Sequence, residues 1–287
     1  MGRKGHQYMA MNILITGGTG AFGTAFAKHL LENNLSDRIV IFSRGEYRQF
    51  LMRQELKDDK RLRFMIGDVR DRWRLTRAMQ GSEVVVHAAA LKRIEVGFYN
   101  PVEMVRTNVD GAINVVEAAQ DAKVKKVIAL SSDKAFQPIS PYGQSKALAE
   151  SIFLAADSHS AGRGPRFAVC RYGNVWNSTG SVGPAWKNIL AAGTNYVPVT
   201  DPDCTRFFMR MDEAVALVLR TIQTMKGGEI EIPTLPAYRL RDLAKAMGAE
   251  MRIIGLPAWE KPHESMCDGN SSDSARRMTI DELRAAI

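Results

Sequence analysis

The sequence contains few cysteines and no long hydrophobic run. Its three cysteines, Cys170, Cys204 and Cys267, are widely spaced and odd in number, which argues against a disulfide framework and against a zinc knuckle. We predict no metal site. A low cysteine content is typical of proteins in a reducing cytoplasm. No apolar run approaches the length of a membrane span, and no signal peptide is visible. The sequence therefore predicts a cytoplasmic protein without a membrane partner.

The chain also lacks nucleic-acid-binding motifs, internal repeats and low-complexity segments. Its net charge is +8, but the basic residues are spread along the 287 positions. We therefore predict no nucleic-acid partner, since an anionic small ligand explains the basic excess at least as well. The hydrophobic fraction of 45% is that of an ordinary globular protein, and the length allows one or two domains. Residues 1–10 are polar and basic and are expected to form a disordered leader.

A glycine-rich turn follows the first apolar run. Residues 11–16 form a short continuous apolar segment, as expected of a strand buried on both faces of a parallel sheet. A turn with glycines at 17, 20 and 23 then leads into a helical pattern over 24–32. Without a Cβ atom, such a turn lets backbone amides approach a pyrophosphate at a helix N-terminus. The cofactor-binding residues predicted here are Gly17, Thr19, Gly20, Ala21, Phe22 and Gly23.

Short apolar strands alternate with helical patterns through the first part of the chain. Further strands are predicted at 38–42, 62–66, 83–87, 126–130 and 167–171, with a helix over 100–121. This alternation predicts an α/β fold with a doubly wound parallel sheet. We predict a dinucleotide-binding domain over 11–175 and a smaller substrate-binding lobe over 176–287, interleaved with the first domain.

The ends of the second and fourth predicted strands carry residues suited to a dinucleotide. An acidic residue after the second strand would select NAD, whereas Ser43 and Arg44 suit a 2′-phosphate. We therefore predict NADP, with a solvated surface charge as the alternative for Arg44. Ala88 and Ala89 leave room for the cofactor, and Asp68 is expected either to accept the adenine amino group or to begin a helix as its N-cap. His87 lies in an apolar run and is expected to be a core histidine.

Residues 131–146 (SSDKAFQPISPYGQSK) place a hydroxyl, a carboxylate, two amines and a phenol close together. Tyr142 and Lys146 are four residues apart in a helical pattern and share one helix face. Beside a nicotinamide, an ammonium would lower the phenol pKa, so that Tyr142 takes the proton of a substrate hydroxyl while Lys146 holds the ribose. Ser132 can hydrogen-bond the same substrate oxygen. Asp133 and Lys134 are expected on a loop facing the helix start.

These motifs resemble a known family. The turn over 17–23 with Tyr142 and Lys146 resembles the extended short-chain dehydrogenase/reductase superfamily, which has a Rossmann fold. Within it, the chain over about residues 11–263 resembles the inverting UDP-N-acetylglucosamine 4,6-dehydratases that open pseudaminic-acid synthesis. Asp133 and Lys134 are the most discriminating part. The other matching segments are 43–44 (SR), 67–71 (GDVRD), 88–92 (AAALK), 107–108 (TN), 171–175 (RYGNV), 205–207 (TRF) and 227–230 (GGEI).

The resemblance implies an NADP-dependent sugar-nucleotide 4,6-dehydratase that is a homo-oligomer and acts on a UDP-sugar. Oxidation at C4 makes the C5 hydrogen acidic. By the resemblance, Lys134 is then the base that removes the C5 proton, and Asp133 is the acid that expels the C6 hydroxyl as water. Hydride then returns to C6, and C5 is inverted. Lys134 must be neutral to act, and Lys146 or the cationic nicotinamide is expected to lower its pKa. The resemblance adds Val69, Lys92 and Thr107 as cofactor contacts. The implied substrate contacts are Lys92, Asn174, Thr200 and Arg206.

The chain departs from the family at three places. Residues 90–95 (ALKRIE) replace the usual AMKHVP, Pro257 stands where the family has a phosphate-contacting Arg, and the chain ends at Ile287, short of the family's C-terminal region. The nucleotide and the sugar that the chain binds therefore stay open. Two other functions also stay open: a sugar-nucleotide epimerase or reductase without water loss, and a non-catalytic NADP-binding protein. For Asp133 and Lys134 the alternative is an exposed surface ion pair, and for Lys92, Asn174 and Arg206 an ordinary surface or turn role.

Overall fold

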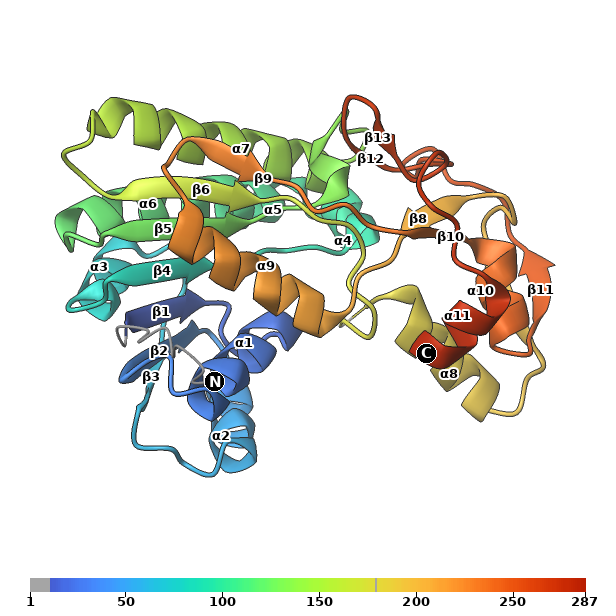
Figure 1. Ribbon diagram of the computed structural model, residues 1–287, viewed down its shortest axis with the longest axis horizontal. Coiled ribbons are helices and arrows are strands. Elements are labelled where there is room, and N and C mark those ends of the chain that lie inside the picture. The colour runs from blue at the N-terminus through green and yellow to red at the C-terminus, as the bar shows by residue number, and fades with distance from the viewer. Residues whose placement is uncertain (1–10, 179) are drawn as a thin grey trace, which may run out of the picture.

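The computed structural model describes residues 11–178 and 180–287, and the leader predicted at 1–10 lies outside the described residues. Seven parallel strands form one sheet in the order β3-β2-β1-β4-β5-β6-β9. Helices cover both faces of this sheet (Figure 1). The predicted fold, a doubly wound parallel sheet of the Rossmann type, is confirmed.

The inner strands of the central sheet are short apolar runs with both faces buried, whereas the edge strands β3 and β9 are only partly buried. Ile13, Leu14 and Ile15 of β1 are fully buried, which is typical of a parallel sheet with helices on both sides. The strand order reverses between β1 and β4, and ligands bind outside the carboxyl ends of strands at such a point. The seven strands are β1 (Asn12–Thr16), β2 (Arg38–Ser43), β3 (Leu62–Ile66), β4 (Val84–His87), β5 (Lys126–Leu130), β6 (Arg166–Cys170) and β9 (Glu229–Glu231).

Two groups of helices pack on the sheet. On one face, apolar side chains of α1 (Ala21–Glu32), α2 (Glu46–Glu55) and α9 (Met211–Thr224) form one core with the strands. On the other face, α3 (Arg72–Met79), α6 (Gly111–Asp121) and α7 (Pro141–Ser160) form a second core. The tight packing of small residues such as Ala112 and Ala149 lets these helices lie close to the strands. Among the described residues, no helix is both long and apolar enough to span a bilayer.

The helix predicted over 100–121 forms in three parts. The α5 helix (Pro101–Val105) runs into a π-helical turn, η1 (Arg106–Asp110), and then into α6. The turn contains the buried side chains of Thr107 and Asn108. Asn108 donates a hydrogen bond from Nδ2 to the Ser145 Oγ atom at 2.9 Å, and it exchanges two further hydrogen bonds with the backbone of Leu91. The π turn thereby ties the loop after β4 to α7.

A smaller lobe lies beside the carboxyl edge of the sheet (Figure 1). Its core contains Trp176, Trp186, Phe208 and Tyr238. Its elements are α8 (Val182–Ala191), β7 (Tyr196–Val199), β8 (Thr205–Phe207), β10 (Ala237–Arg239), α10 (Leu240–Ala246), β11 (Glu250–Ile253) and α11 (Ile280–Ala286). The remaining short elements lie at or near the side of this lobe that faces the sheet. They are α4 (Ile94–Tyr99), the turn η2 (Asp133–Ala135), β12 (Ser265–Cys267) and β13 (Asn270–Ser271).

The chain crosses between the two lobes more than once. After β8 it returns to the sheet, where α9 packs on α1 and β9 pairs with β6. It then leaves again for β10. A buried ion pair strengthens the junction: Arg171, just after β6, donates from Nε to Glu150 Oε1 of α7 at 2.9 Å and also bonds the carbonyl of Met266 in β12. The division at residue 175 stays a prediction.

Candidate active site

The turn after β1 leaves backbone N–H groups at the crevice. Gly17 has φ of +64°, and a Cβ atom there would lie 2.8 Å from the Cα atom of Ala89, so glycine is required. Gly20 is the N-cap of α1, and within the described chain no side chain caps this helix and its first turn has no acidic residue. The first N–H groups of a helix have no partner inside it. A dinucleotide pyrophosphate fits this cradle.

Of the remaining residues predicted in this turn, some lie beside the crevice and others pack within the protein. Thr19, Ala21 and Phe22 are half-buried at the start of α1, and the Phe22 ring stacks on Phe26 at 5.4 Å between ring centroids. Gly23 is buried, and a Cβ atom there would lie 2.5 Å from the carbonyl oxygen of Gly18. Gly23 is therefore explained by the close approach of α1 to the preceding turn.

The residues predicted to read the ribose have partners within the protein. Ser43 is buried, and its Oγ atom accepts a hydrogen bond from Gln49 Nε2 at 3.0 Å. The Arg44 side chain is 57% exposed, with Nη1 at 3.8 Å from Asp68 Oδ2. Asp68 also accepts hydrogen bonds from Arg70. The N-cap of α3 is Asp71 and not Asp68, so the N-cap alternative for Asp68 is wrong.

Small and apolar side chains line the crevice beside β4. Ala88 and Ala89 are half-buried, whereas Val69 and Thr107 are buried. His87 is a core histidine, as predicted: its Nδ1 atom lies 2.8 Å from the Thr16 hydroxyl, and burial together with the charge of Lys146 lowers its pKa to about 3. His87 is therefore neutral at physiological pH.

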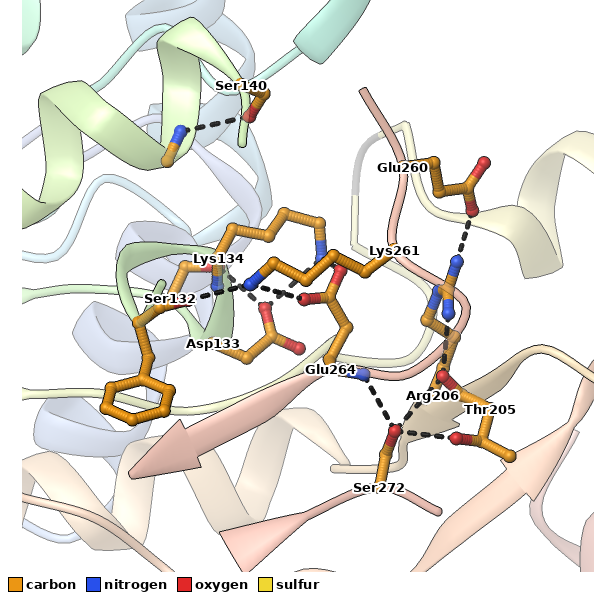
Figure 2. Close-up of polar contacts among 12 residues, drawn as sticks. Ser132, Asp133, Lys134, Ser140, Thr205, Arg206, Glu260, Lys261, Glu264 and Ser272 are labelled. Carbon is orange, nitrogen blue, oxygen red and sulfur yellow. Dashed lines mark hydrogen bonds and ion pairs between the residues drawn. The ribbon is translucent and has the colours of Figure 1, made fainter. Parts of the chain in front are cut away.

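Asp133 and Lys134 lie together in η2, at the carboxyl end of β5 (Figure 2). Asp133 is fully buried, and its Oδ1 atom accepts a hydrogen bond from the Ser132 hydroxyl at 2.9 Å and lies 3.2 Å from Lys134 Nζ. The Lys134 side chain is 17% exposed. The alternative that this is an exposed surface pair is therefore wrong. The other carboxylate oxygen, Asp133 Oδ2, is buried with no hydrogen-bond partner in the described chain, as suits a group aimed at a ligand.

A second carboxylate, Glu264, completes this cluster and was not predicted. Its side chain is 2% exposed; its Oε1 atom lies 3.1 Å from Lys134 Nζ, and its Oε2 atom lies 3.6 Å from Lys261 Nζ. Lys261 also donates to the carbonyl of Phe136 at 2.7 Å. The contact joins segments far apart in the chain, and nothing near Glu264 in the sequence marks it. A small cavity beside the cluster is lined by Ile94, Lys134, Ile139, Ser140, Trp259, Lys261 and Glu264.

The charges in the cluster depend on one another. Burial raises the pKa of Asp133; Lys134 opposes this shift and the like charge of Glu264 adds to it. Burial alone would lower the pKa of Lys134, but Asp133 and Glu264 outweigh it, and the pKa is raised. The predicted lowering of the Lys134 pKa by Lys146 is therefore wrong, because Lys134 lies between two carboxylates. The pKa of Glu264 is lowered, because the positive charges of Lys134, Arg206 and Lys261 together outweigh the effect of burial.

Tyr142 and Lys146 lie on the first turns of α7, which begins at Pro141. Ser140 is the N-cap of this helix (Figure 2). Burial raises the pKa of Tyr142, against the opposing effects of the Lys134 charge and a Ser132 hydrogen bond. The predicted lowering by Lys146 is thus wrong. Burial lowers the pKa of Lys146 itself to about 8, and its Nζ atom donates to the carbonyl of Leu130 at 2.6 Å. This hydrogen bond anchors Lys146 to the end of β5.

The predicted substrate contacts are spread around the crevice. Lys92 is exposed and Asn174 is half-buried. The Thr200 hydroxyl is buried with no hydrogen-bond partner in the described chain. Arg206 is 4% exposed and donates to the carbonyl of Pro262. It also donates to the carbonyl of Thr205 and to the carboxylate of Glu260 (Figure 2). Its guanidinium therefore already holds one anionic group. Within the described residues, no cluster of three or more His, Cys, Asp or Glu side chains could hold a metal ion.

Residues 13–284 match the family described as "Polysaccharide biosynthesis protein". A Campylobacter jejuni protein named UDP-N-acetylglucosamine 4,6-dehydratase (inverting) is 44% identical over 263 residues, which are 91% of this chain and 78% of that protein. A Rickettsia akari protein named UDP-glucose 4-epimerase is 39% identical over 278 residues, 94% of this chain and 80% of that protein. The solved structure of Pen from Bacillus thuringiensis is 32% identical, superposes with a TM-score of 0.92 and covers 98% of each chain.

Proposed function

Because this chain belongs to the family of polysaccharide biosynthesis proteins, we propose that it is a sugar-nucleotide 4,6-dehydratase that acts on UDP-N-acetylglucosamine and inverts C5. The observation that carries the proposal is the buried pair of Asp133 and Lys134 at the end of β5, beside Tyr142 and Lys146 of α7. A hydride-transfer enzyme that eliminates no water needs the second pair but has no use for the first.

The cradle at the start of α1 supports a nicotinamide dinucleotide as cofactor, and Arg44 favours NADP. A bound cofactor would supply a hydride acceptor for C4 of the sugar and a hydride donor for C6. The uncapped N-terminus of α1 would hold its pyrophosphate. Lys146, anchored to the end of β5, is placed to hold the nicotinamide ribose.

Different side chains of the site carry out the separate proton transfers of the reaction. Tyr142 takes the proton of the C4 hydroxyl, with Ser132 hydrogen-bonded to the same oxygen. Asp133 gives its proton to the C6 hydroxyl, which leaves as water, and burial shifts the pKa of Asp133 upward, the direction that an acid requires. Lys134 removes the C5 proton. Since its two carboxylate neighbours favour the ammonium, Lys134 loses its proton only when further positive charge approaches it.

The proposal predicts that deuterium from the solvent enters the product at C5. UDP-N-acetylglucosamine incubated with the protein and NADP in deuterated water is expected to give a 4-keto-6-deoxy sugar with one deuterium at C5, because C5 is deprotonated and then reprotonated from solvent. Mass spectrometry and proton NMR would measure it. Recovery of unchanged substrate, or of an epimer that retains its C6 oxygen, would contradict the dehydratase and favour a binding protein or an epimerase.

Arg44 is predicted to select NADP over NAD. Replacing Arg44 by alanine is expected to weaken NADP binding by about tenfold or more, because a charge-assisted hydrogen bond contributes about 1.5–3 kcal/mol, and to leave NAD binding within about threefold. Fluorescence titration with NADPH and NADH would measure both dissociation constants. Arg163→Ala, at another exposed arginine, is the matched control. Equal losses for the two cofactors, or no loss for either, would remove Arg44 from the selection.

A further inference from the structure

Glu264 has an unusual position for a carboxylate. It is 2% exposed and lies just before β12, in a segment of the smaller lobe that reaches over the end of β5. Figure 2 shows its side chain between the amines of Lys134 and Lys261. Burying a carboxylate is costly unless it is paired and hydrogen-bonded. The two ammonium groups offset that cost, although the Oε2 atom has no hydrogen-bond partner in the described chain. The backbone is held separately, since the Glu264 N–H donates to the Ser272 hydroxyl at 2.9 Å.

We propose that Glu264 is a positioning residue for Lys134, whose carboxylate fixes the place and the charge of the Lys134 amine beside Asp133. The proposal rests on the dehydratase function proposed above, in which Lys134 is the base at C5. A lysine side chain has four rotatable bonds, so an amine that must reach one carbon of a sugar needs a partner to hold it. Paired with Asp133 alone, the Lys134 amine would lie against the η2 turn that carries both residues. Glu264 comes from the smaller lobe, so its carboxylate holds the amine between the two lobes.

The hydrogen bonds around Glu264 make its position definite. Ser272 Oγ lies 2.7 Å from the Thr205 hydroxyl and donates to the Thr205 carbonyl at 3.2 Å. Since Thr205 precedes Arg206 in β8, the segment that carries Glu264 is tied to the strand that carries Arg206. Glu264 therefore couples the Lys134 amine to the part of the smaller lobe expected to contact the substrate diphosphate.

Several groups besides Glu264 set the charge of Lys134. The titratable and charged groups that face it are Asp133 of the same turn, Arg206 of β8, Tyr142 of α7 and Tyr238 of β10. Burial and Arg206 lower the pKa of Lys134, whereas Asp133 and Glu264 raise it. Removing the negative charge of Glu264 therefore lowers the pKa of Lys134 and increases the neutral fraction of its amine at any given pH.

Labelling of Lys134 by acetic anhydride tests the coupling without substrate, because only the neutral amine reacts. At about pH 9, Glu264→Gln is expected to label Lys134 about tenfold faster than the wild type, since a change of one pKa unit alters the neutral fraction tenfold. Glu264→Asp retains the charge and is expected to stay within about threefold of the wild-type rate. Mass spectrometry of the peptide containing Lys134 gives both rates. Glu260→Gln, which removes a carboxylate that pairs with Arg206 and not with Lys134, is the matched control.

Two labelling results would overturn the inference. One is a wild-type rate in Glu264→Gln; the other is equally fast labelling in Glu264→Asp, which would show that looser packing and not charge exposes the amine. Turnover tests the position of the amine separately. Glu264→Asp, which keeps the charge but shortens the side chain, is expected to lower kcat for C5 exchange by about tenfold with KM within about threefold, and an effect on KM alone would also overturn it.

The two proposals fail in distinguishable ways. If the wild type leaves UDP-N-acetylglucosamine unchanged, the dehydratase is wrong whatever the labelling rates are. If the wild type makes the deuterated product but Glu264→Gln labels and turns over as the wild type does, only the role of Glu264 is wrong.

Discussion

Replacing Lys134 by arginine is expected to lower the rate of C5 exchange by about 10²–10⁴-fold, the usual contribution of a general base. Arginine keeps the positive charge between Asp133 and Glu264, but its pKa above about 12 prevents it from accepting a proton. An alanine would instead leave two buried carboxylates facing each other, at a cost of about 3–5 kcal/mol. The arginine variant therefore separates loss of the base from loss of the fold.

Deuterium incorporation at C5 would measure the effect, with the melting temperature as the test of folding. The matched control is Lys125→Arg, the same substitution in a surface ion pair with Glu83, which is expected to turn over as the wild type does. Because oxidation at C4 precedes removal of the C5 proton, Lys134→Arg is also expected to accumulate reduced cofactor on mixing with substrate. Normal exchange in this variant would remove Lys134 as the base and leave it an electrostatic role.

Six of the seven strands of the sheet could be predicted from sequence because each is a local signal, whereas β9, with two glutamates in three residues, is not a continuous apolar run. The run over 62–66 was predicted with the bounds of β3, and the run over 38–42 falls one residue short of β2. A continuous apolar run bounded by turns needs no long-range information to be recognised. The helix over 100–121 was also found, but its π turn was not, because the hydrogen bonds of Asn108 to Leu91 and Ser145 form only after the chain has folded.

The sequence predicts which side chains of the candidate site lie together, but it does not predict their pKa shifts; that they are site residues stays a prediction. Asp133, Lys134, Tyr142 and Lys146 lie within one short stretch, so their proximity follows from the chain itself. The signs of two pKa shifts were wrong because they depend on burial and on Glu264, which reaches Lys134 from the other lobe. Sequence spacing indicates which groups can meet, whereas the environment of each group is set by tertiary packing. Glu264 is the clearest case. Its ion-pair partner Lys134 is far from it in the sequence, and only its other partner, Lys261, is a sequence neighbour.

Replacing Tyr142 by phenylalanine is expected to stop the reaction one step earlier than Lys134→Arg does. The phenol is the group placed to take the C4 proton, so its loss should lower the rate of C4 oxidation by about 10²–10⁴-fold. Since C5 becomes acidic only after C4 is oxidised, C5 exchange should fall by the same factor. The substitution removes only a hydroxyl from a half-buried side chain at the start of α7, and the fold is expected to persist.

Single-turnover absorbance of the nicotinamide distinguishes the two variants. Tyr142→Phe is expected to show no reduced cofactor and no deuterium at C5, whereas Lys134→Arg shows reduced cofactor without deuterium. Burial raises the pKa of Tyr142, so the phenolate fraction, and with it the oxidation rate in the wild type, should rise with pH below that pKa; this rise should be absent from the residual rate of Tyr142→Phe. Tyr47→Phe, at an exposed tyrosine of α2, is the matched control for the substitution. Reduced cofactor formed at the wild-type rate in Tyr142→Phe would assign the C4 proton to another group, and Ser132 would then be the next hydroxyl to test.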